Sequence, residues 1–397
     1  MRIAILNTDY PSFLRELYAD QPGLERASYD EQMAARNRSL FAVADFYSRA
    51  LKNLGHQADE FHLNNEPLQR AWGREHGALP RKRYRLGRQC QFIPWIRSDE
   101  IEDWKLKIIE AQIRDYRPDV IWNQAPDNIF TDVMRRMRPL AKVLMVQQAS
   151  PPLPEAEDWS LYDLAISSFP PRVEWFRERG IPSHLNRLAF GKSVLGQFPA
   201  SFSRDLPITF IGSLSTLHTS RTDLLEKIAR NFPLQVWGPS ADQLPHDSFL
   251  RRAYRGTAWG TKMYEILARS RIAFNHHGNF PPFANNMRMY EATGMGAMLL
   301  TDWKPDLHEM FEPGREALAY RNDEECLELI AQALQKPDWS GQIAQAGQAR
   351  TLSTHTYERR MEELIPLLEQ AISKKAGNGR SRFETAENSS DREALRS

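Results

Sequence analysis

Cysteine is scarce in this chain, and so are long apolar runs and any excess of charge of one sign. Its two cysteines, Cys90 and Cys326, lie far apart among 397 residues, which excludes a disulfide framework or a cysteine-based zinc site. No apolar run approaches the roughly 20 residues that cross a bilayer, and the opening MRIAILNTDYPSFL lacks the apolar core of a secretory signal. A net charge of +1 gives no global field toward nucleic acid. We therefore expect a cytoplasmic protein that binds no nucleic acid.

Strands alternate with helices along the first half of the chain. RIAILN at residues 2–7 is an apolar run typical of a buried parallel strand, and residues 39–54 show the apolar spacing of a helix. Further strands are expected at 56–63, 118–124, 142–148 and 162–168, and helices at 104–116 and 127–137. This alternation predicts βαβ units and a mostly parallel sheet.

A second series of the same kind begins at residue 207. Its expected strands are 207–213, 234–238, 272–275 and 297–301, and its expected helices are 221–231, 261–268 and 286–293. Residues 191–206 have few periodic signals and separate the two series as an interdomain linker. The fold class is therefore α/β, with two doubly wound domains. A last helix is expected near 357–372, followed by a polar, disordered tail at 374–397.

The segment RIAFNHHGNFPPFANNMRMYEATGMGAMLLTD, residues 271–302, carries the clearest functional signal. Asn285 or Asn286 can cap its short helix, whose first amides then face a long polar loop. Arg288 adds a positive charge in the first turn, where the helix dipole already favours an anion. Glu291 follows three residues later, on the same face. A ligand with a phosphate at one end and hydroxyls at the other suits these groups, which indicates a nucleotide sugar.

An ordinary surface ion pair is the alternative for Arg288 and Glu291, because such pairs are common and weak. The position of their helix favours the ligand site. It lies between a long loop and a Gly-Met-Gly break that precedes a strand, and open α/β sheets bind ligands at such places.

Four segments of the second half carry a family resemblance. They are ITFIGSLSTLHTSR (208–221), ILARSRIAFNHHG (266–278), NMRMYEATGMGAMLLTD (286–302) and LHEMFEPGREALAYRNDEECLELI (307–330). They resemble the GT-B glycosyltransferases, most closely the CgeB-like proteins with a "glycosyl transferases group 1" domain. The resemblance implies two Rossmann-like domains facing across a cleft. The domain at 1–190 would take the acceptor, the domain at 207–352 the nucleotide sugar, and a helix at 353–373 would cross back to the first domain.

The resemblance also implies roles for residues of the second domain. Glu291 would bind the ribose of the donor, since a carboxylate accepts two bonds from a vicinal diol, and Arg288 with the helix amides would meet the diphosphate. The remaining donor-binding residues would be Gly212, Ser213, His218, Arg221, Lys262, Asn285 and Asn286. A solvated helix residue for Arg221 and a plain loop residue for His218 remain as alternatives.

The residue at position 283 departs from the family pattern. Many relatives carry a second glutamate eight residues before the ribose glutamate, and here Phe283 stands in its place. This departure leaves the stereochemistry open, and with it an inactive or divergent enzyme. If the enzyme inverts configuration, Asp9, after the first strand, is the candidate base; its alternative is a turn-forming role before Tyr10 and Pro11. A retaining enzyme needs no dedicated base.

No metal or cofactor is expected. The chain has no Asp-x-Asp of the kind that holds a divalent metal in the other large glycosyltransferase fold, and GT-B enzymes stabilise the leaving diphosphate with a helix N-terminus and basic side chains. His276 and His277 are neighbours on an expected strand, so they should point to opposite faces and not ligate one ion.

One segment is clearly basic and belongs to the expected acceptor domain. Its charges are Arg81, Lys82, Arg83, Arg85 and Arg88. They could hold an anionic or lipid-linked acceptor, or touch the inner face of a membrane peripherally. A solvated basic loop is the alternative.

The sequence therefore predicts a metal-independent glycosyltransferase that moves a hexosyl or related sugar from a nucleotide sugar to a glycan, lipid-linked sugar or protein. A nucleotide-sugar epimerase on the same fold is one alternative. A nucleotide-binding scaffold that lost turnover is another, and Phe283 is the residue that favours it.

Overall fold

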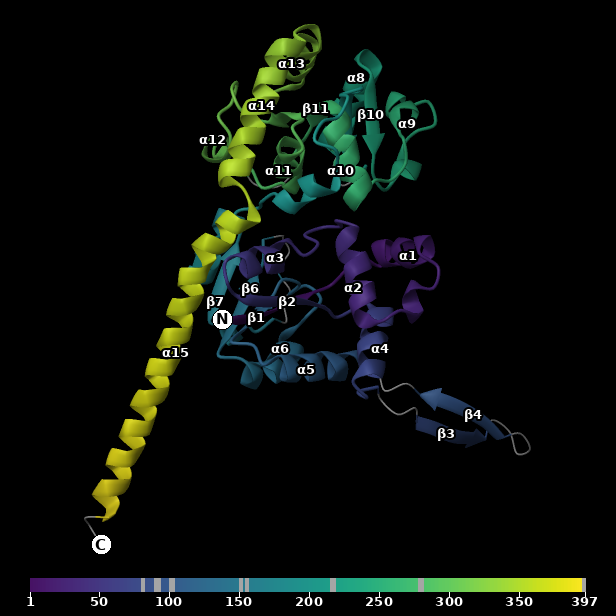
Figure 1. Ribbon diagram of the computed structural model, residues 1–397. Coiled ribbons are helices and arrows are strands. Elements are labelled where there is room, and N and C mark those ends of the chain that lie inside the picture. Colours follow the sequence, from purple (N-terminus) through teal and green to yellow (C-terminus); the bar gives the residue numbers. More distant parts are fainter. Residues whose placement is uncertain are drawn as a thin grey trace.

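The computed structural model describes residues 1–79, 83–88, 94–99, 104–149, 153, 157–214, 219–277 and 282–394, with backbone only at 83–88, 94–99, 219–220 and 376–394. Two α/β domains are stacked end to end, and a long C-terminal helix runs along one side of the first (Figure 1). This arrangement confirms the predicted fold class.

The first domain is built on a parallel sheet with strand order β2-β1-β5-β6-β7-β8. Its strands are β1 (Arg2–Asn7), β2 (Gln57–His62), β5 (Val120–Asn123), β6 (Val143–Gln147), β7 (Leu164–Ser167) and β8 (Ser183–Leu185). Alternate residues of β1 face two separate cores, with Ile3 and Ile5 in one and Ala4 and Leu6 in the other. Both faces are therefore covered, as parallel sheets require. The helices of this domain are α1 (Pro11–Asp20), α2 (Tyr29–Arg38), α3 (Phe46–Asn53), α4 (Glu66–Glu75), α5 (Trp104–Tyr116), α6 (Thr131–Met137) and α7 (Pro170–Arg177).

The second domain repeats this plan with strand order β10-β9-β11-β12-β13, again all parallel. Its strands are β9 (Leu206–Ile211), β10 (Leu234–Trp237), β11 (Ser270–Phe274), β12 (Met298–Asp302) and β13 (Leu318–Tyr320). Its helices are α8 (Thr219–Asn231), α9 (Phe249–Ala253), α10 (Gly260–Arg269), α11 (Met287–Gly294), α12 (Leu307–Met310), α13 (Asp323–Gln335) and α14 (Pro337–Thr354). The strand order changes direction at β9, so β9 and its neighbours end where open sheets bind ligands.

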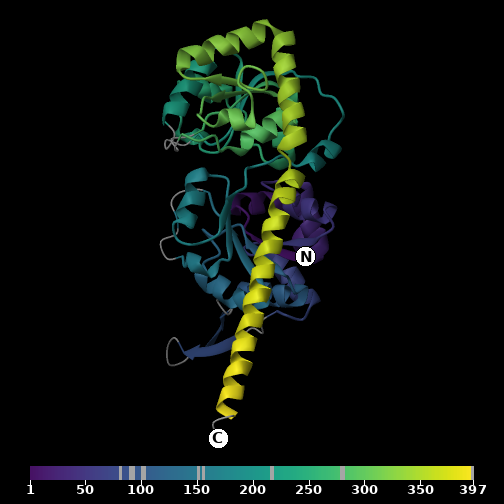
Figure 2. The same cartoon turned by 90° about the vertical axis from the view of Figure 1, so that its left-hand side faces the viewer.

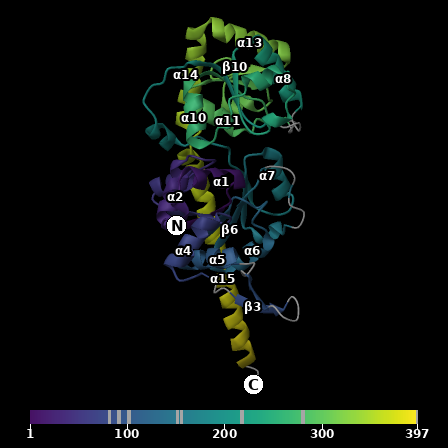
Figure 3. The same ribbon diagram turned by 90° about the vertical axis from the view of Figure 1, so that its right-hand side faces the viewer.

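Helix α15 (Tyr357–Ala394) returns from the second domain to the first. Tyr357, Met361 and Leu364 are buried in a core that they share with α3, and the rings of Tyr357 and Tyr47 are 4.6 Å apart. Figures 2 and 3 show the helix passing along the first domain and beyond it. The helix continues through the segment 374–394 that was expected to be disordered. Among the described residues, no helix has the length and apolarity to cross a membrane.

The basic segment begins the antiparallel hairpin of β3 (Arg83–Arg88) and β4 (Pro94–Asp99). The hairpin projects from the first domain, away from the second (Figure 1). Arg81 and Lys82 lie outside the described residues, whereas the backbones of Arg83, Arg85 and Arg88 lie on β3. A role for these cations in binding an acceptor or a membrane remains a prediction.

The helix expected over 39–54 is wrong in its first half. Residues 39–45 form a loop, called here the α2–α3 loop, and helix α3 begins only at Phe46. Leu40, Ala42 and Ala44 have positive φ angles of 55°, 51° and 43°. Left-handed backbone costs an ordinary residue about 1–2 kcal/mol, so tertiary contacts must hold this loop against its helical propensity.

Candidate functional site

A pocket of about 510 Å³ opens between the two domains. The second domain lines it with residues that follow β9, β10 and β11, and the first domain contributes Tyr10 and the middle of the α2–α3 loop. Residues of the second domain that line it are Gly212, Ser213, Arg221, Gly238, Trp259, Asn275, His276, Asn286, Arg288 and Glu291. This interdomain pocket therefore lies at the carboxyl ends of the parallel strands, and its volume is within the usual range of ligand sites.

Helix α11 points its N-terminus at this pocket and begins as the sequence predicts. Asn286 is the N-cap, and its Oδ1 accepts a hydrogen bond from the amide of Arg288 over 2.9 Å. The amide of Met289 donates to the carbonyl of Asn286 over 3.2 Å. Because the protein already binds these two amides, an anion at this end depends more on the helix dipole and on Arg288 than on several amides.

Arg288 and Glu291 form an ion pair on the pocket side of α11. Arg288 Nη1 donates to Glu291 Oε2 over 2.7 Å, and Arg288 Nε donates to the carbonyl of Ile211 over 3.3 Å. Glu291 is 6% exposed. Burial raises the pKa of Glu291, and the charge of Arg288 opposes part of that rise. The carboxylate of the pair is thus buried and its guanidinium half-buried, unlike the weak surface pair that was its alternative.

A second cation, Arg221, also lines the pocket and is 8% exposed. The guanidinium of Arg221 donates from Nη2 to the carbonyl of Ser213 over 2.5 Å, and its Cζ lies 5.5 Å from the centroid of Phe210. Arg221 Nε and Trp259 Nε1 are buried donors without a partner among the described residues. Burial lowers the pKa of Arg221, although the guanidinium stays charged. Unpaired buried donors are costly, and an anionic ligand in the pocket would satisfy them.

Two glycines in the pocket lining, Gly212 and Gly238, bring the loops that follow β9 and β10 close together. A Cβ on Gly238, whose φ is +155°, would lie 1.8 Å from the carbonyl oxygen of Gly212. Any side chain at 238 would therefore push apart the loops that follow β9 and β10. At this close approach the pocket wall is formed by backbone atoms alone.

The α2–α3 loop forms the first-domain wall of the pocket, which no sequence pattern predicted. Phe41, Ala42 and Val43 line the pocket, and the carbonyl of Ser39 accepts from the amide of Thr261 over 2.9 Å at the start of α10. The amide of Thr261 is one of the N-terminal amides that have no partner within helix α10, and this hydrogen bond joins it to the loop of the first domain.

Not every expected donor-site residue lies in the pocket. Lys262 is exposed, donates from Nζ to the carbonyl of Thr257 over 2.9 Å, and lines a different, shallower cavity. Asn285 is half-buried next to the cap and does not appear among the residues that line the pocket. His218 lies outside the described residues.

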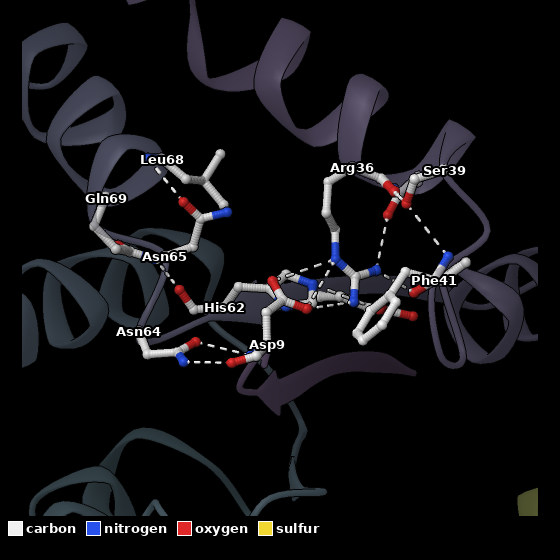
Figure 4. Close-up of polar contacts among 12 residues, drawn as sticks. Asp9, Arg36, Ser39, Phe41, His62, Asn64, Asn65, Leu68 and Gln69 are labelled. Atoms are coloured by element: carbon white, nitrogen blue, oxygen red, sulfur yellow. Dashed lines mark hydrogen bonds and ion pairs between the residues drawn. The ribbon is translucent and has the colours of Figure 1, made fainter. Parts of the chain in front are cut away.

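Asp9, the candidate base, is buried in a polar cluster below the α2–α3 loop (Figure 4). Its Oδ1 accepts from Arg36 Nη2 over 2.8 Å, and its Oδ2 lies 3.2 Å from His62 Nδ1. Burial alone would raise the pKa of Asp9, but the neighbouring His62 and Arg36 outweigh it and hold the pKa well below its usual range. For His62 itself, burial and Arg36 lower the pKa, so the neutral ring leaves Arg36 as the cation of the cluster. Asp9 can act as a base only where its pair with Arg36 opens.

His276 and His277 do not point to opposite faces. They follow the end of β11, and both approach Asp302 at the end of β12, His277 Nδ1 at 2.7 Å from Oδ1 and His276 Nδ1 at 3.5 Å from Oδ2. Burial would raise the pKa of Asp302, but hydrogen bonds from both histidines hold it well below its usual range. The strand-alternation argument fails because it applies only inside a strand. Among the described residues, no cluster of His, Cys, Asp and Glu has the geometry of a metal site.

Phe283 packs against the first domain. Its ring meets that of Phe169 edge to face, with centroids 5.7 Å apart. The position that holds an acid in many relatives therefore makes an apolar contact between the domains.

Several proteins of known structure share this architecture. Sucrose-phosphate synthase from Thermosynechococcus elongatus and the glycosyltransferase AviGT4 of avilamycin A biosynthesis each superpose with a TM-score of 0.53 and 13% identity, over 94% of this chain and 100% and 98% of theirs. HepE from Anabaena, solved in complex with UDP-glucose, superposes with a TM-score of 0.53 and 12% identity, over 93% of this chain and all of its own. The chain has the GT-B fold.

The sequence of the second domain agrees with this finding. Residues 221–366 match the family described as glycosyl transferase-like, and the match includes Arg221, Arg288 and Glu291. No curated protein sequence matches the chain. The GT-B protein described here is thus glycosyltransferase-like in its second domain, and the narrower CgeB-like resemblance stays a prediction.

Proposed function

We propose that this GT-B protein transfers a sugar from a nucleotide sugar to an acceptor hydroxyl, with the donor bound in the interdomain pocket. The observation that carries the proposal is the Arg288–Glu291 pair at the N-terminus of α11, whose carboxylate is buried and which faces a cavity lined by both domains. Support comes from the glycosyl transferase-like sequence of residues 221–366 and from the fold shared with HepE, which was solved with UDP-glucose.

In this proposal the nucleoside diphosphate lies along the second domain. Glu291 Oε2 is engaged by Arg288, so the ribose diol would bind to Oε1 or share Oε2 with the guanidinium. The diphosphate would lie between Arg288 and Arg221, where the buried donor Arg221 Nε would gain a partner. Gly212 and Gly238 would let the phosphates approach the backbone.

Sugar transfer breaks the bond between the anomeric carbon and the phosphate oxygen, and negative charge builds on the leaving diphosphate. Two fixed guanidinium groups and the positive end of α11 would stabilise that charge without a metal ion. Losing one such donor typically raises the barrier by about 3–4 kcal/mol. The acceptor would enter from the first domain, past Tyr10 and the α2–α3 loop. We infer no dedicated base, because Asp9 is held by Arg36.

A nucleotide-binding protein without turnover is the second candidate. The observation that favours it is Phe283, whose ring packs on Phe169 where many relatives carry an acid. Such a protein would bind the nucleotide in the same pocket and leave the donor intact.

The first test is thermal unfolding of the purified chain with UDP, GDP, dTDP, ADP and CMP and with their common sugars. A ligand present at a hundred times its dissociation constant should stabilise the protein by about 2.7 kcal/mol. A response to one nucleotide, lost in Glu291→Gln, would support the assigned pocket. No response to any ligand would contradict it.

The second test separates the two candidate functions. The nucleotide sugar that stabilises the protein is incubated with it, and release of the nucleoside diphosphate is followed with and without simple sugar acceptors. Release that Glu291→Gln abolishes would support transfer or donor hydrolysis. Tight binding with an intact donor under all conditions would favour the non-catalytic protein.

A further inference from the structure

A second cavity, of about 580 Å³, lies wholly within the first domain. It is a groove between α2 and α3, with β2 as its floor and the end of α5 closing it, and it is called here the α2–α3 groove. Asn37 and Asp45 line this groove, whereas Phe41 and Val43, between them in sequence, line the interdomain pocket. The α2–α3 loop thus separates the two cavities, and no described residue lines both.

Buried polar atoms without partners gather in this groove. Gln112 is 2% exposed, and neither its Nε2 nor its Oε1 has a hydrogen-bond partner among the described residues. Glu60 is 4% exposed; its Oε1 accepts from Ser48 Oγ over 3.1 Å, whereas its Oε2 has no hydrogen bond and lies 3.8 Å from His62 Nε2. Buried amides and carboxyls are nearly always bound in folded proteins, so a pair that faces one cavity needs an explanation.

The charges that line the groove exclude an anion. Its two cations are already neutralised, since Arg49 pairs with Asp45 at 2.6 Å and Lys52 pairs with Asp59 at 2.7 Å. The lining also includes carboxylates that would repel a phosphate. A metal ion does not fit either, because the described acids do not cluster with metal-site geometry.

What fits is a neutral ligand that both donates and accepts hydrogen bonds. The amide of Gln112 offers two donors and an acceptor, and the carboxyl of Glu60 lines the same groove. Burial raises the pKa of Glu60 to about 7, so near neutral pH that carboxyl can donate as well as accept. Tyr29 and Trp72 add aromatic rings to the lining, although one face of Trp72 is covered by the ring of His76 at 4.1 Å. Adjacent hydroxyls on a ring with an apolar face have this combination of properties.

We propose that the α2–α3 groove is a second carbohydrate site, which binds one neutral sugar residue through Gln112 and Glu60. Binding at this groove does not depend on catalysis in the interdomain pocket. That the sugar belongs to the glycan acceptor rests on the proposed function and on the position of the groove, directly behind the loop that lines the interdomain pocket.

Saturation-transfer NMR on the full chain tests this directly. The probes are D-glucose, D-galactose, D-mannose and N-acetyl-D-glucosamine, and the corresponding β-linked disaccharides. We expect at least one probe to bind with millimolar affinity and Gln112→Leu to weaken it tenfold or more. Asp115→Ala replaces an exposed residue that lines the groove, so it should weaken sugar binding a few fold and leave the packing of the core unchanged. The site is refuted if no probe binds, or if both variants bind like the native chain.

Glu291→Gln serves as the matched control, because it alters the interdomain pocket only. It should keep full sugar binding at the groove, so failure of the donor site and failure of the groove can be told apart. Disaccharides that bind tenfold more tightly than their monosaccharides would support a glycan acceptor. Equal affinities would still support the site, with a free sugar as its ligand. Loss of sugar binding in Glu291→Gln would place the sugar in the interdomain pocket and overturn the proposal.

Discussion

Arg36 joins Asp9 to the loop that lines the interdomain pocket. Its Nη2 donates to Asp9 Oδ1 over 2.8 Å, and its Nη1 donates to the carbonyl of Ala44 over 2.7 Å. Ala44 is one of the three loop residues with positive φ. A buried ion pair adds little net stability, because both charges lose their hydration. Here the pair has a second effect, because Arg36 also holds the end of the strained α2–α3 loop at Ala44.

Replacing Arg36 with methionine should destabilise the first domain. The change leaves the carboxylate of Asp9 buried without its cation, which typically costs about 3–5 kcal/mol. Denaturant unfolding measures the loss. The double variant Asp9→Asn with Arg36→Met should be more stable than Arg36→Met alone, because the buried carboxylate at position 9 is then absent as well. Arg38→Met, on the exposed side of the same helix, is the control and should change stability little. Equal stability of Arg36→Met and Arg38→Met would contradict the anchoring role.

Gly260 should be essential for docking the α2–α3 loop on α10. Its φ is +46°, and a Cβ there would lie 1.9 Å from the carbonyl oxygen of Ser39. Gly260→Ala should therefore break the Ser39–Thr261 hydrogen bond and weaken nucleotide binding as well as lower the melting temperature. Gly77→Ala is the matched control, because Gly77 has a φ of +61° with open space around it. Gly77→Ala should lower the unfolding free energy only by the cost of left-handed backbone, about 1–2 kcal/mol. A melting temperature and affinity no lower than those of the control would remove the docking role.

Arg288 and Glu291 should differ in the part of the donor that they recognise. Arg288→Gln should weaken binding of the nucleoside diphosphate that stabilises the protein by about tenfold or more, since a hydrogen bond to a charged group contributes about 1.5–3 kcal/mol. Binding of the parent nucleoside should barely change, because it has no phosphate. Glu291→Gln should weaken both, because both contain the ribose. Isothermal titration of each variant with both ligands gives the comparison. Equal losses for the two ligands in Arg288→Gln would exclude its phosphate role.

Much of the fold could be read from periodicity, and the failures have a common cause. The parallel strands except β8 and β13 lie within a few residues of their expected ranges, and so do helices α5, α8, α10 and α11, because their apolar spacing agrees with their burial. The short strands β8 and β13 were not predicted from periodicity. Helices α1 and α2 were not predicted. For α2 the reason is that it turns a largely polar sequence, YDEQMAARNR, toward the buried cluster around Arg36. The α2–α3 loop was mistaken for helix because long-range contacts with Arg36 and Thr261 override its local propensity.

The candidate site divides in the same way. Asn286, Arg288 and Glu291 are close in sequence, so a helix start and its spacing were enough to bring them together. The approach of His276 and His277 to Asp302 depends on where β11 ends, a boundary that sequence patterns fix poorly. The wall supplied by the first domain and the partners of Asp9 depend on contacts across 27 or more residues, which no local pattern encodes.

Glu60 gives the protein a pH dependence with a definite sign. Burial raises its pKa from 4.5 to about 7, although Arg36 and the hydrogen bonds from Ser48 oppose the rise. The folded state therefore holds this proton more tightly than the unfolded state. The contribution is fully present below pH 4.5 and is lost as the pH rises to about 7. At about 1.4 kcal/mol per pH unit over that window, the loss is on the order of 3 kcal/mol.

Glu60→Gln isolates this contribution. The amide oxygen can still accept from Ser48, but the side chain no longer titrates, so the variant should lose less stability than the native chain between pH 4.5 and 7.5. Denaturant unfolding at half-unit steps of pH measures both proteins, and the other titrating groups largely cancel in the difference. The difference in unfolding free energy should grow through the window and become constant above it. Parallel curves would show that Glu60 is ionised in the folded protein throughout, and the donor capacity assigned to its carboxyl in the α2–α3 groove would be lost with it.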